Sequence, residues 1–350
     1  MSNKHTIHNK TDKAKHEYDF AFLVHPRNIQ DIYKKFPFFK IIPVVLFMFF
    51  FKNISPVILA TVRGAVDENG KKIKGVIISL PITAEQMLRD RNQAKKQVFR
   101  AIKKAKKLGA TYVGLGSFTS VVTSGGEDVR GLVEGVHVTN GNALTTSMTY
   151  LGIQDLIRNS AVSESNIAII GATGSIGSAV TELLTKDGSF GTLYIVGRTP
   201  SHIQKLLQRI TPHPHSHRVI ETSMEEALPK VDIVLIATSA SGTVVQADLL
   251  KKNAIVYDIT QPKNTPEDLL IKRPDVTFID GGLIKLPDHI HVGYNFGIPT
   301  NTSFSCLAET ILLSLARYPD DFCVGNVTLE QVKYAETLAN RYNFSPIRHT

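Results

Sequence analysis

The chain has 350 residues, of which 40 are Lys or Arg and 31 are Asp or Glu, so its formal net charge is +9. This length predicts two or three domains, and a hydrophobic content of 43% predicts globular cores. Two cysteines exclude a disulfide framework and favour a reducing, cytoplasmic compartment. The positive charge favours an acidic partner. Because no signature of a nucleic-acid-binding module accompanies it, we do not expect that partner to be nucleic acid.

The first part of the chain predicts a tail and an apolar segment. Residues 1–18 are mostly polar, lack the apolar core of a secretory signal and predict a disordered tail. The apolar run within 36–51 is flanked by lysines and is shorter than the about 20 residues that span a bilayer. It predicts either an anchor lying peripherally on the inner face of the membrane, or a buried hairpin or pocket wall.

Residues 19–160 predict an N-terminal α/β domain. Strands are expected at 57–63, 75–80, 111–115 and 136–139, with helices at 84–108 and 145–158. Between Arg89 and Lys107 the first helix carries nine basic residues against one acid, Asp90. Solvated helix faces usually mix charges of both signs, so this face predicts either a docking surface for an acidic carrier or an unusually basic solvated face.

Residues 161–290 predict a Rossmann domain. An apolar strand at 166–170 is followed at once by a glycine-rich turn and then by a helix that ends at Gly188. Glycines at such a turn let the backbone approach a pyrophosphate, and the free N–H groups of the helix start point at it. The predicted loop consists of Gly171, Ala172, Thr173, Gly174, Ser175, Ile176 and Gly177.

The cofactor expected in this domain is NADPH. An NAD-specific domain commonly has an acidic residue after its second strand, whereas this chain has Arg198 and Thr199 there, which suit a 2′-phosphate. Further strands in βα rhythm end in polar residues that should line the cofactor cleft, because ligands gather at the carboxyl edge of a parallel sheet. These residues are Thr238, Ser239, Lys263, Asp280 and Gly281.

The last part of the chain, 291–350, predicts a helical segment with a candidate nucleophile. Cys306 lies near a helix start and off the apolar stripe of that helix, so it is either a small buried hydrophobic residue or a reactive thiol. A helix start is expected to lower the pKa of a thiol. Cys323 lacks this setting and is expected to be inert. His213, His215 and His217 alternate with proline and serine and predict a plain loop rather than a metal site.

Residues 75–345 resemble one family, the long-chain acyl-(acyl carrier protein) reductases. The resemblance rests on motifs whose order and spacing agree: the basic helix, 114–120, Thr139-Asn140-Gly141-Asn142, Gly171–Ala179, 262–264, Gly281-Gly282 and 305–310. The sequence departs from the family where Asn140 replaces a threonine and where Leu144 replaces a histidine or tyrosine. It therefore does not identify a proton donor.

The resemblance implies an activity. In that family a cysteine takes an acyl group as a thioester, and NADPH then reduces it to an aldehyde; the role falls on Cys306 here. The expected substrate is a long-chain acyl thioester of acyl carrier protein or coenzyme A. Two alternatives remain: an NADP-dependent dehydrogenase of a small hydroxy or amino acid with no covalent step, and a protein that binds NADPH without catalysis.

Overall fold

The computed structural model describes residues 17–35, 37–42, 54–159, 164–239 and 245–348. The predicted tail at 1–18 lies outside the described residues except for its last two, Glu17 and Tyr18, whose backbone N–H groups donate to the Leu108 carbonyl at 3.0 and 3.1 Å. The segment 36–51 is described only over 37–42. There Pro37–Ile41 form a 3-10 turn that leaves the Ile41 side chain 86% exposed.

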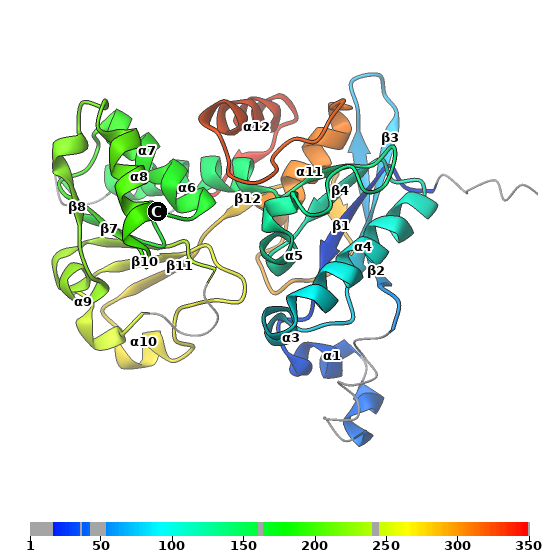
Figure 1. Ribbon diagram of the computed structural model, residues 1–350, viewed down its shortest axis with the longest axis horizontal. Coiled ribbons are helices and arrows are strands. Elements are labelled where there is room, and N and C mark those ends of the chain that lie inside the picture. Colours follow the sequence, from blue (N-terminus) through cyan, green and yellow to red (C-terminus); the bar gives the residue numbers. More distant parts are fainter. Residues whose placement is uncertain (1–16, 36, 43–53, 160–163, 240–244, 349–350) are drawn as a thin grey trace, which may run out of the picture.

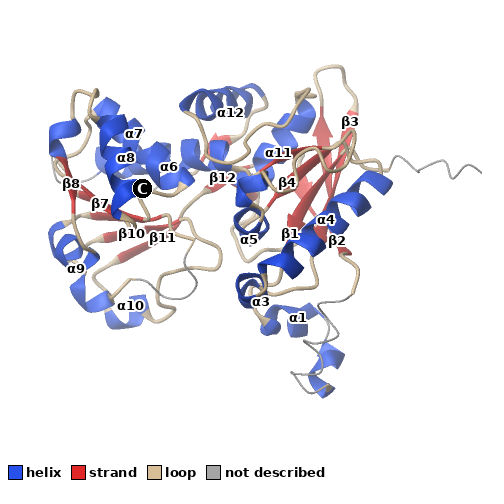
Figure 2. Cartoon of the chain, viewed as in Figure 1, coloured by secondary structure: helices blue, strands red, loops and turns tan. Residues whose placement is uncertain are grey.

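The protein is an α/β structure built on two six-stranded sheets, with a small three-stranded antiparallel sheet as a third element (Figures 1 and 2). This confirms the predicted fold class. The short strands β12 (Leu283–Lys285), β14 (Thr302–Phe304) and β15 (Ser345–Pro346) form the small sheet. None of the helices in the described ranges has an apolar stretch long enough to cross a membrane.

The N-terminal sheet has the order β13-β2-β3-β1-β4-β5. Its strands β3, β1, β4 and β5 run parallel, whereas at one edge β2 pairs antiparallel with β3, and β13 pairs antiparallel with β2. The strands are β1 (Phe20–Val24), β2 (Val57–Val66), β3 (Lys72–Ser79), β4 (Tyr112–Leu115), β5 (His137–Thr139) and β13 (His291–Val292). The edge strand β13 comes from the predicted C-terminal segment, so that segment contributes to this sheet.

Each face of the N-terminal sheet is covered by one long helix. Alternate residues of β1 point to opposite faces, as the pleat of a strand requires. Ala21 and Leu23 pack with the apolar face of α4 (Arg91–Lys107), and Phe20 and Phe22 pack with α11 (Ser305–Leu315). The remaining helices of this part are α1 (Ile29–Lys35), α3 (Ala84–Arg89) and α5 (Phe118–Val122).

The prediction of a single helix over 84–108 is wrong. The chain forms two helices, α3 and α4, which meet at Asp90 with φ −131° and ψ 81°. The Asp90 carboxylate accepts the Gln93 backbone N–H at 2.9 Å and so caps α4. An aspartate prefers a cap to a helix interior because its short side chain competes for backbone N–H groups.

The second sheet has the order β11-β10-β9-β6-β7-β8 with every pairing parallel. If β6 is numbered as the first strand of this half, the order is 6-5-4-1-2-3, which is that of a Rossmann fold. In such a fold ligands bind where the strand order reverses, which is between β6 and β9 here. The strands are β6 (Ile167–Ile170), β7 (Leu193–Val196), β8 (Val219–Glu221), β9 (Ile233–Ile236), β10 (Ile255–Asp258) and β11 (Thr277–Asp280). The helices are α7 (Ser175–Asp187), α8 (Pro200–Ile210), α9 (Met224–Ala227) and α10 (Leu269–Lys272).

Helix α6 (Asn142–Asn159) joins the two halves. It begins three residues before the predicted start at 145, and it packs against α7 of the Rossmann part as well as against α11 and α12 (Leu329–Arg341). In Figure 1 it lies between the two sheets, close to α7 and α12. Its first residues are therefore held where both halves of the molecule meet.

Candidate active site

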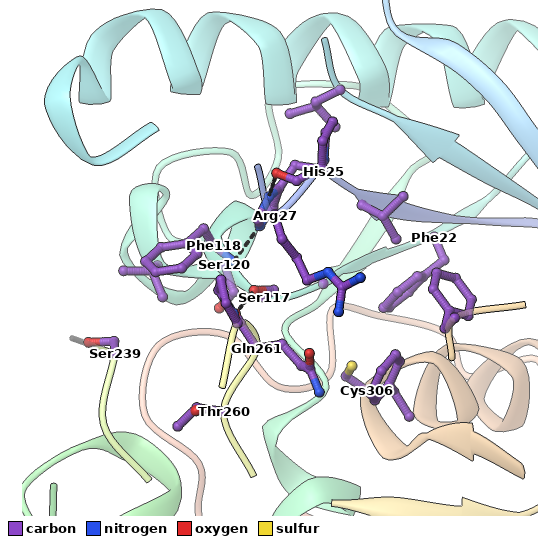
Figure 3. A pocket seen from close by; sticks show the side chains of 18 of the residues that line it. Phe22, His25, Arg27, Ser117, Phe118, Ser120, Ser239, Thr260, Gln261 and Cys306 are labelled. Carbon is purple, nitrogen blue, oxygen red and sulfur yellow. Dashed lines mark hydrogen bonds between the residues drawn. The ribbon is translucent and has the colours of Figure 1, made fainter. Parts of the chain in front are cut away.

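A cavity of 1020 Å³ opens where the carboxyl ends of the parallel strands of the two large sheets meet. Residues that follow β1 and β4 line one side, and residues that follow β6, β9 and β10 line the other. Figure 3 shows Phe22 and Cys306 on one side of it, with Ser239 and Thr260 on the other. A hydrogen bond connects the two sides, because the Ser117 hydroxyl donates to the Gln261 carbonyl at 2.5 Å.

The glycine-rich turn between β6 and α7 has the geometry of a phosphate loop. Gly171 has φ +90°, and a Cβ there would lie 2.8 Å from the Ala237 carbonyl oxygen, so only glycine fits. Gly174 caps α7 without a side-chain hydrogen bond. Gly174, Ser175 and Ile176 line the cavity, so the first N–H groups of α7 can meet an anion there. The loop therefore fits the pyrophosphate of a dinucleotide.

The other residues of the predicted loop shape the turn rather than the cavity wall. The N–H groups of Gly171 and Ala172 both donate to the Val196 carbonyl, at 2.9 and 3.1 Å. Thr173 packs toward Gly197, and Gly177 lies so close to Gly171 that a Cβ would overlap the Gly171 backbone. These contacts fix the angle between strand and helix.

The strand-end residues divide into two groups. Thr238, Ser239 and Gly281 line the cavity. Asp280 instead forms an ion pair with Lys263, whose ammonium group also donates to the Asp258 carbonyl at 2.7 Å.

Arg198 and Thr199 are exposed after the end of β7 and are not part of the cavity wall. A Rossmann fold holds the ribose of its cofactor after its second strand, which is β7 here.

Cys306 is the second residue of α11, and its sulfur faces the cavity (Figure 3). Its neighbours along the helix, Ser305 and Leu307, are fully buried. Burial raises the pKa of the Cys306 thiol to about 12, and the nearby Glu309 carboxylate adds to the increase. The Leu307 N–H lowers the pKa, but by less. The N–H groups of the helix start thus lower the pKa of this thiol in the expected direction, but desolvation outweighs them, so the resulting pKa is high rather than low.

Three residues around Cys306 entered the sequence analysis only as members of the motifs that carry the family resemblance. Gly141, with φ +77°, lies against it, and a Cβ at Gly141 would lie 2.5 Å from the Cys306 Cα. Asn142 also lines the cavity, and its side-chain N–H donates to the Ser175 hydroxyl at 3.1 Å. Glu309 is 1% exposed beneath them. These contacts join residues distant in sequence, so only the motifs at 139–142 and 305–310 gave a signal.

Two other positions bear on proton transfer. Leu144, where the resemblance led us to expect a histidine or tyrosine, is fully buried in the apolar core. His25, which the sequence analysis missed, lines the cavity. Its Nδ1 lies 3.0 Å from the Pro26 carbonyl and its Nε2 accepts the Phe118 N–H at 3.3 Å, while burial lowers the pKa of the ring. Both nitrogens of a neutral His25 are therefore engaged, and it shapes the cavity.

The cysteine that we expect to be inert, Cys323, and the three histidines of the predicted plain loop, His213, His215 and His217, lie outside the cavity. Cys323 is fully buried. His213 lies 3.4 Å from the Glu182 carboxylate, and His215 contacts the Arg218 guanidinium at 3.0 Å.

Much of the cavity wall on the N-terminal side is apolar. The side chains come from β1, α1, β2, β14 and the segment between β13 and β14. They include Phe22, Val24, Ile32, Leu59, Tyr294, Phe296 and Phe304. Ile54 and Val57 also line the cavity and are 43% and 40% exposed, so they lie at its opening. Such a wall suits an apolar ligand.

Comparison with known proteins agrees with this geometry. The model of the shikimate / quinate 5-dehydrogenase family matches residues 155–277, which include the glycine-rich turn and most of the Rossmann sheet. A long-chain acyl-[acyl-carrier-protein] reductase of Synechococcus elongatus is 25% identical over 294 residues, covering 79% of this chain and 84% of the relative. The chain is an NAD(P)-dependent oxidoreductase of the Rossmann type.

Other similar proteins carry different names. An aminotransferase, PigE, of a Serratia species is 31% identical over 284 residues, which are 79% of this chain but 32% of PigE. The chain thus spans about a third of the length of that relative. The solved L-tryptophan dehydrogenase of Nostoc punctiforme is 11% identical with a TM-score of 0.39, covering 92% of this chain and 80% of that one.

Proposed function

We propose that this oxidoreductase reduces a long-chain acyl thioester to a fatty aldehyde through an acyl group held on Cys306. One observation carries the proposal: the Cys306 thiol faces a cavity whose wall joins the start of α7 to a set of apolar side chains. The candidate nucleophile, the glycine-rich turn and an apolar wall that could accommodate an alkyl chain thus share one cavity. The similarity to the Synechococcus reductase supports the same chemistry.

The covalent step balances in atoms and charge. The Cys306 thiolate attacks the carbonyl carbon of the substrate thioester, a new C–S bond forms, and the carrier leaves as its own thiolate. The N–H groups at the start of α11 lie beside the sulfur and can stabilise the oxyanion. Reduction of the acyl-enzyme breaks the new C–S bond and returns the Cys306 thiolate.

NADPH bound at the glycine-rich turn would supply the hydride for that reduction. Gly174, Ser175 and Ile176 would hold its pyrophosphate, and Thr238, Ser239 and Gly281 would contact it further along the cavity. The preference for NADPH over NADH rests on Arg198, a cation at the position where an NAD-specific domain commonly places a carboxylate.

The proposed carrier is acidic, as acyl carrier protein is, and we expect it to bind α4. Lys96, Arg100, Lys103 and Lys107 are exposed on this helix. No acidic group in the described ranges lies within 4.0 Å of them, unlike Lys95, which pairs with Asp128 at 2.8 Å. The Pro56 carbonyl accepts a hydrogen bond from Lys104 of α4 at 2.6 Å, so the cavity opening at Ile54 and Val57 adjoins the same helix. Unpaired cations beside the opening suit an acidic partner.

A dehydrogenase of a small hydroxy or amino acid is the second candidate, favoured by the shikimate / quinate dehydrogenase match. That match ends at residue 277 and so does not include Cys306. A direct dehydrogenase would need no nucleophile and no large apolar wall. The two candidates therefore differ in whether Cys306 carries an acyl group.

The test is intact-mass analysis after incubation with a long-chain acyl thioester. Without NADPH we expect one acyl group on the protein, and with NADPH we expect its release as aldehyde. Cys306→Ser should abolish the adduct but keep NADPH binding, because serine is close in size and a far weaker nucleophile. Cys323→Ser is the matched control and should react normally. Aldehyde formation by Cys306→Ser at an undiminished rate would exclude the covalent step.

A further inference from the structure

Glu309 is a carboxylate buried in the core between α11 and α6. Its side chain accepts the Thr139 hydroxyl and the Leu144 backbone N–H, the latter at 2.7 Å. The N–H groups of Gly141 and Ala143 also contribute to its environment and lower its pKa. Burial nevertheless raises the pKa of Glu309 to about 7. A carboxylate in this position is costly unless several donors satisfy it.

Apart from the Thr139 hydroxyl at the end of β5, these donors are backbone N–H groups at the start of α6. The first N–H groups of a helix have no partner within the helix, and a negative charge placed there interacts favourably with them. Glu309 supplies that charge from another helix. It therefore ties the first turn of α6 to α11, the helix that carries Cys306.

The same turn separates the thiol from the glycine-rich turn. Gly141 lies against Cys306, three residues before Glu309 on α11. The next residue, Asn142, donates to the Ser175 hydroxyl at 3.1 Å, and the Val327 N–H donates to that hydroxyl at 3.0 Å. A continuous set of contacts thus runs from the Glu309 carboxylate through Gly141 and Asn142 to Ser175 at the start of α7.

We propose that Glu309 is a positioning residue: by binding the first N–H groups of α6, it holds the Gly141-Asn142 turn between the Cys306 thiol and the glycine-rich turn. This rests on the proposed role of Cys306 as the nucleophile. Glu309 itself does not touch the substrate, since its side chain lies beneath the cavity wall.

Glu309 also contributes a charge to its surroundings. The groups that it faces are Cys306 on its own helix, Cys323 from the segment after α11, and Tyr112 from β4, and burial together with the Glu309 charge raises the pKa of each. Removal of the charge should therefore make the Cys306 thiol easier to ionise. This gives a measurement that a purely structural residue would not change.

Two variants distinguish the effect of the Glu309 charge from the effect of the contacts between Glu309 and α6. Glu309→Gln keeps the size but removes the charge, whereas Glu309→Asp keeps the charge but withdraws it from α6 by one methylene. The first measurement is alkylation of Cys306 by iodoacetamide at pH 8, without cofactor, in a Cys323→Ser background. The second is single-turnover aldehyde formation from an acyl thioester. Glu336→Gln is the matched control, because Glu336 accepts the Ser147 hydroxyl at 2.9 Å further along the same helix.

We expect Glu309→Gln to alkylate about tenfold faster, since a like charge a few ångströms away shifts a pKa by about one unit. Glu309→Asp should show no such acceleration. Both should form aldehyde about tenfold to a hundredfold more slowly, as misplaced reacting groups do. Glu336→Gln should change neither rate.

Three results would overturn the proposal. Slower alkylation of Glu309→Gln would mean that the carboxylate takes the thiol proton itself. Unchanged aldehyde formation in both Glu309 variants would remove the positioning role. If neither variant folds, Thr139→Val loosens the same carboxylate, and undiminished aldehyde formation there would also refute it. An unsubstituted protein that never acquires an acyl group would contradict the proposed function instead, and the alkylation rates would still report the effect of Glu309 on the thiol.

Discussion

Replacement of Gly141 by alanine tests the contact between the turn and the thiol. Position 141 has φ +77°, which L-residues rarely adopt, and an added Cβ would lie 2.5 Å from the Cys306 Cα. Gly70, in the turn between β2 and β3, is the matched control. It has φ +76°, and a Cβ there would have no neighbour within 4 Å. The two glycines thus share a backbone conformation but differ in the space around them.

The structure predicts different costs for the two substitutions. Alanine in the left-handed region costs about 1–2 kcal/mol, and this is the whole expected cost of Gly70→Ala. Gly141→Ala must also displace the start of α11, and overpacking of this kind adds about 1–3 kcal/mol. We therefore expect Gly141→Ala to lower the free energy of unfolding by the larger amount and to slow acylation of Cys306 by about a hundredfold.

Urea unfolding measures the stability of both variants, and intact-mass kinetics with an acyl thioester measures the acylation rate. Gly70→Ala should acylate at the normal rate. NADPH binding should persist in both, because neither glycine belongs to the glycine-rich turn. Equal losses of stability in the two variants, with normal acylation of Gly141→Ala, would refute the close approach of the turn to the thiol.

Three further predictions address the cofactor, the carrier and the thiol. Arg198→Asp should weaken NADPH binding about ten- to a hundredfold relative to NADH, since a charge-assisted contact contributes about 1.5–3 kcal/mol, and fluorescence titration that finds no change in the ratio would contradict this. Reversal of charge at Lys96, Arg100 and Lys103 should raise the KM for an acyl carrier protein substrate more than for its coenzyme A form, whereas equal increases would mean that α4 is only solvated. Because the Cys306 pKa is raised to about 12, acylation should accelerate about tenfold per pH unit between about pH 7 and 9; a plateau in that range would show that substrate binding lowers the pKa.

The Rossmann half was predictable because its signals are local. Strand β6 (Ile167–Ile170), the glycine-rich turn and α7, which Gly188 caps, follow one another directly, and each element is recognisable from neighbouring residues. Strand β1 was not predicted, although it is the central parallel strand of the N-terminal sheet. Its run from Phe20 to Val24 is short and follows a polar segment, so only its pairing partners identify it.

The features that the sequence analysis did not predict depend on contacts in the folded chain. The helical spacing of apolar residues continues across Asp90, so it does not indicate the break between α3 and α4. Asp90 is recognisable as a cap only from its hydrogen bond with the Gln93 N–H. The thiol pKa depends on how much of the cavity wall covers Cys306, which no local pattern records. The sequence gives Glu309 no feature that distinguishes it from other helix residues, because its role depends on its contacts with α6 in the folded chain.

The order in which the chain is made bears on how the N-terminal half matures. One face of its sheet, including Phe20 and Phe22, is covered by Leu307 and Ile311 of α11, nearly three hundred residues later. During synthesis, which generally folds domains from the N-terminus onward, that face has no cover until the Rossmann half has been completed. The apolar patch is then closed by the same helix that brings the thiol into place. Ribosome-bound chains that stop before residue 302 should consequently expose this patch to chaperones, whereas chains that include α11 should bury it.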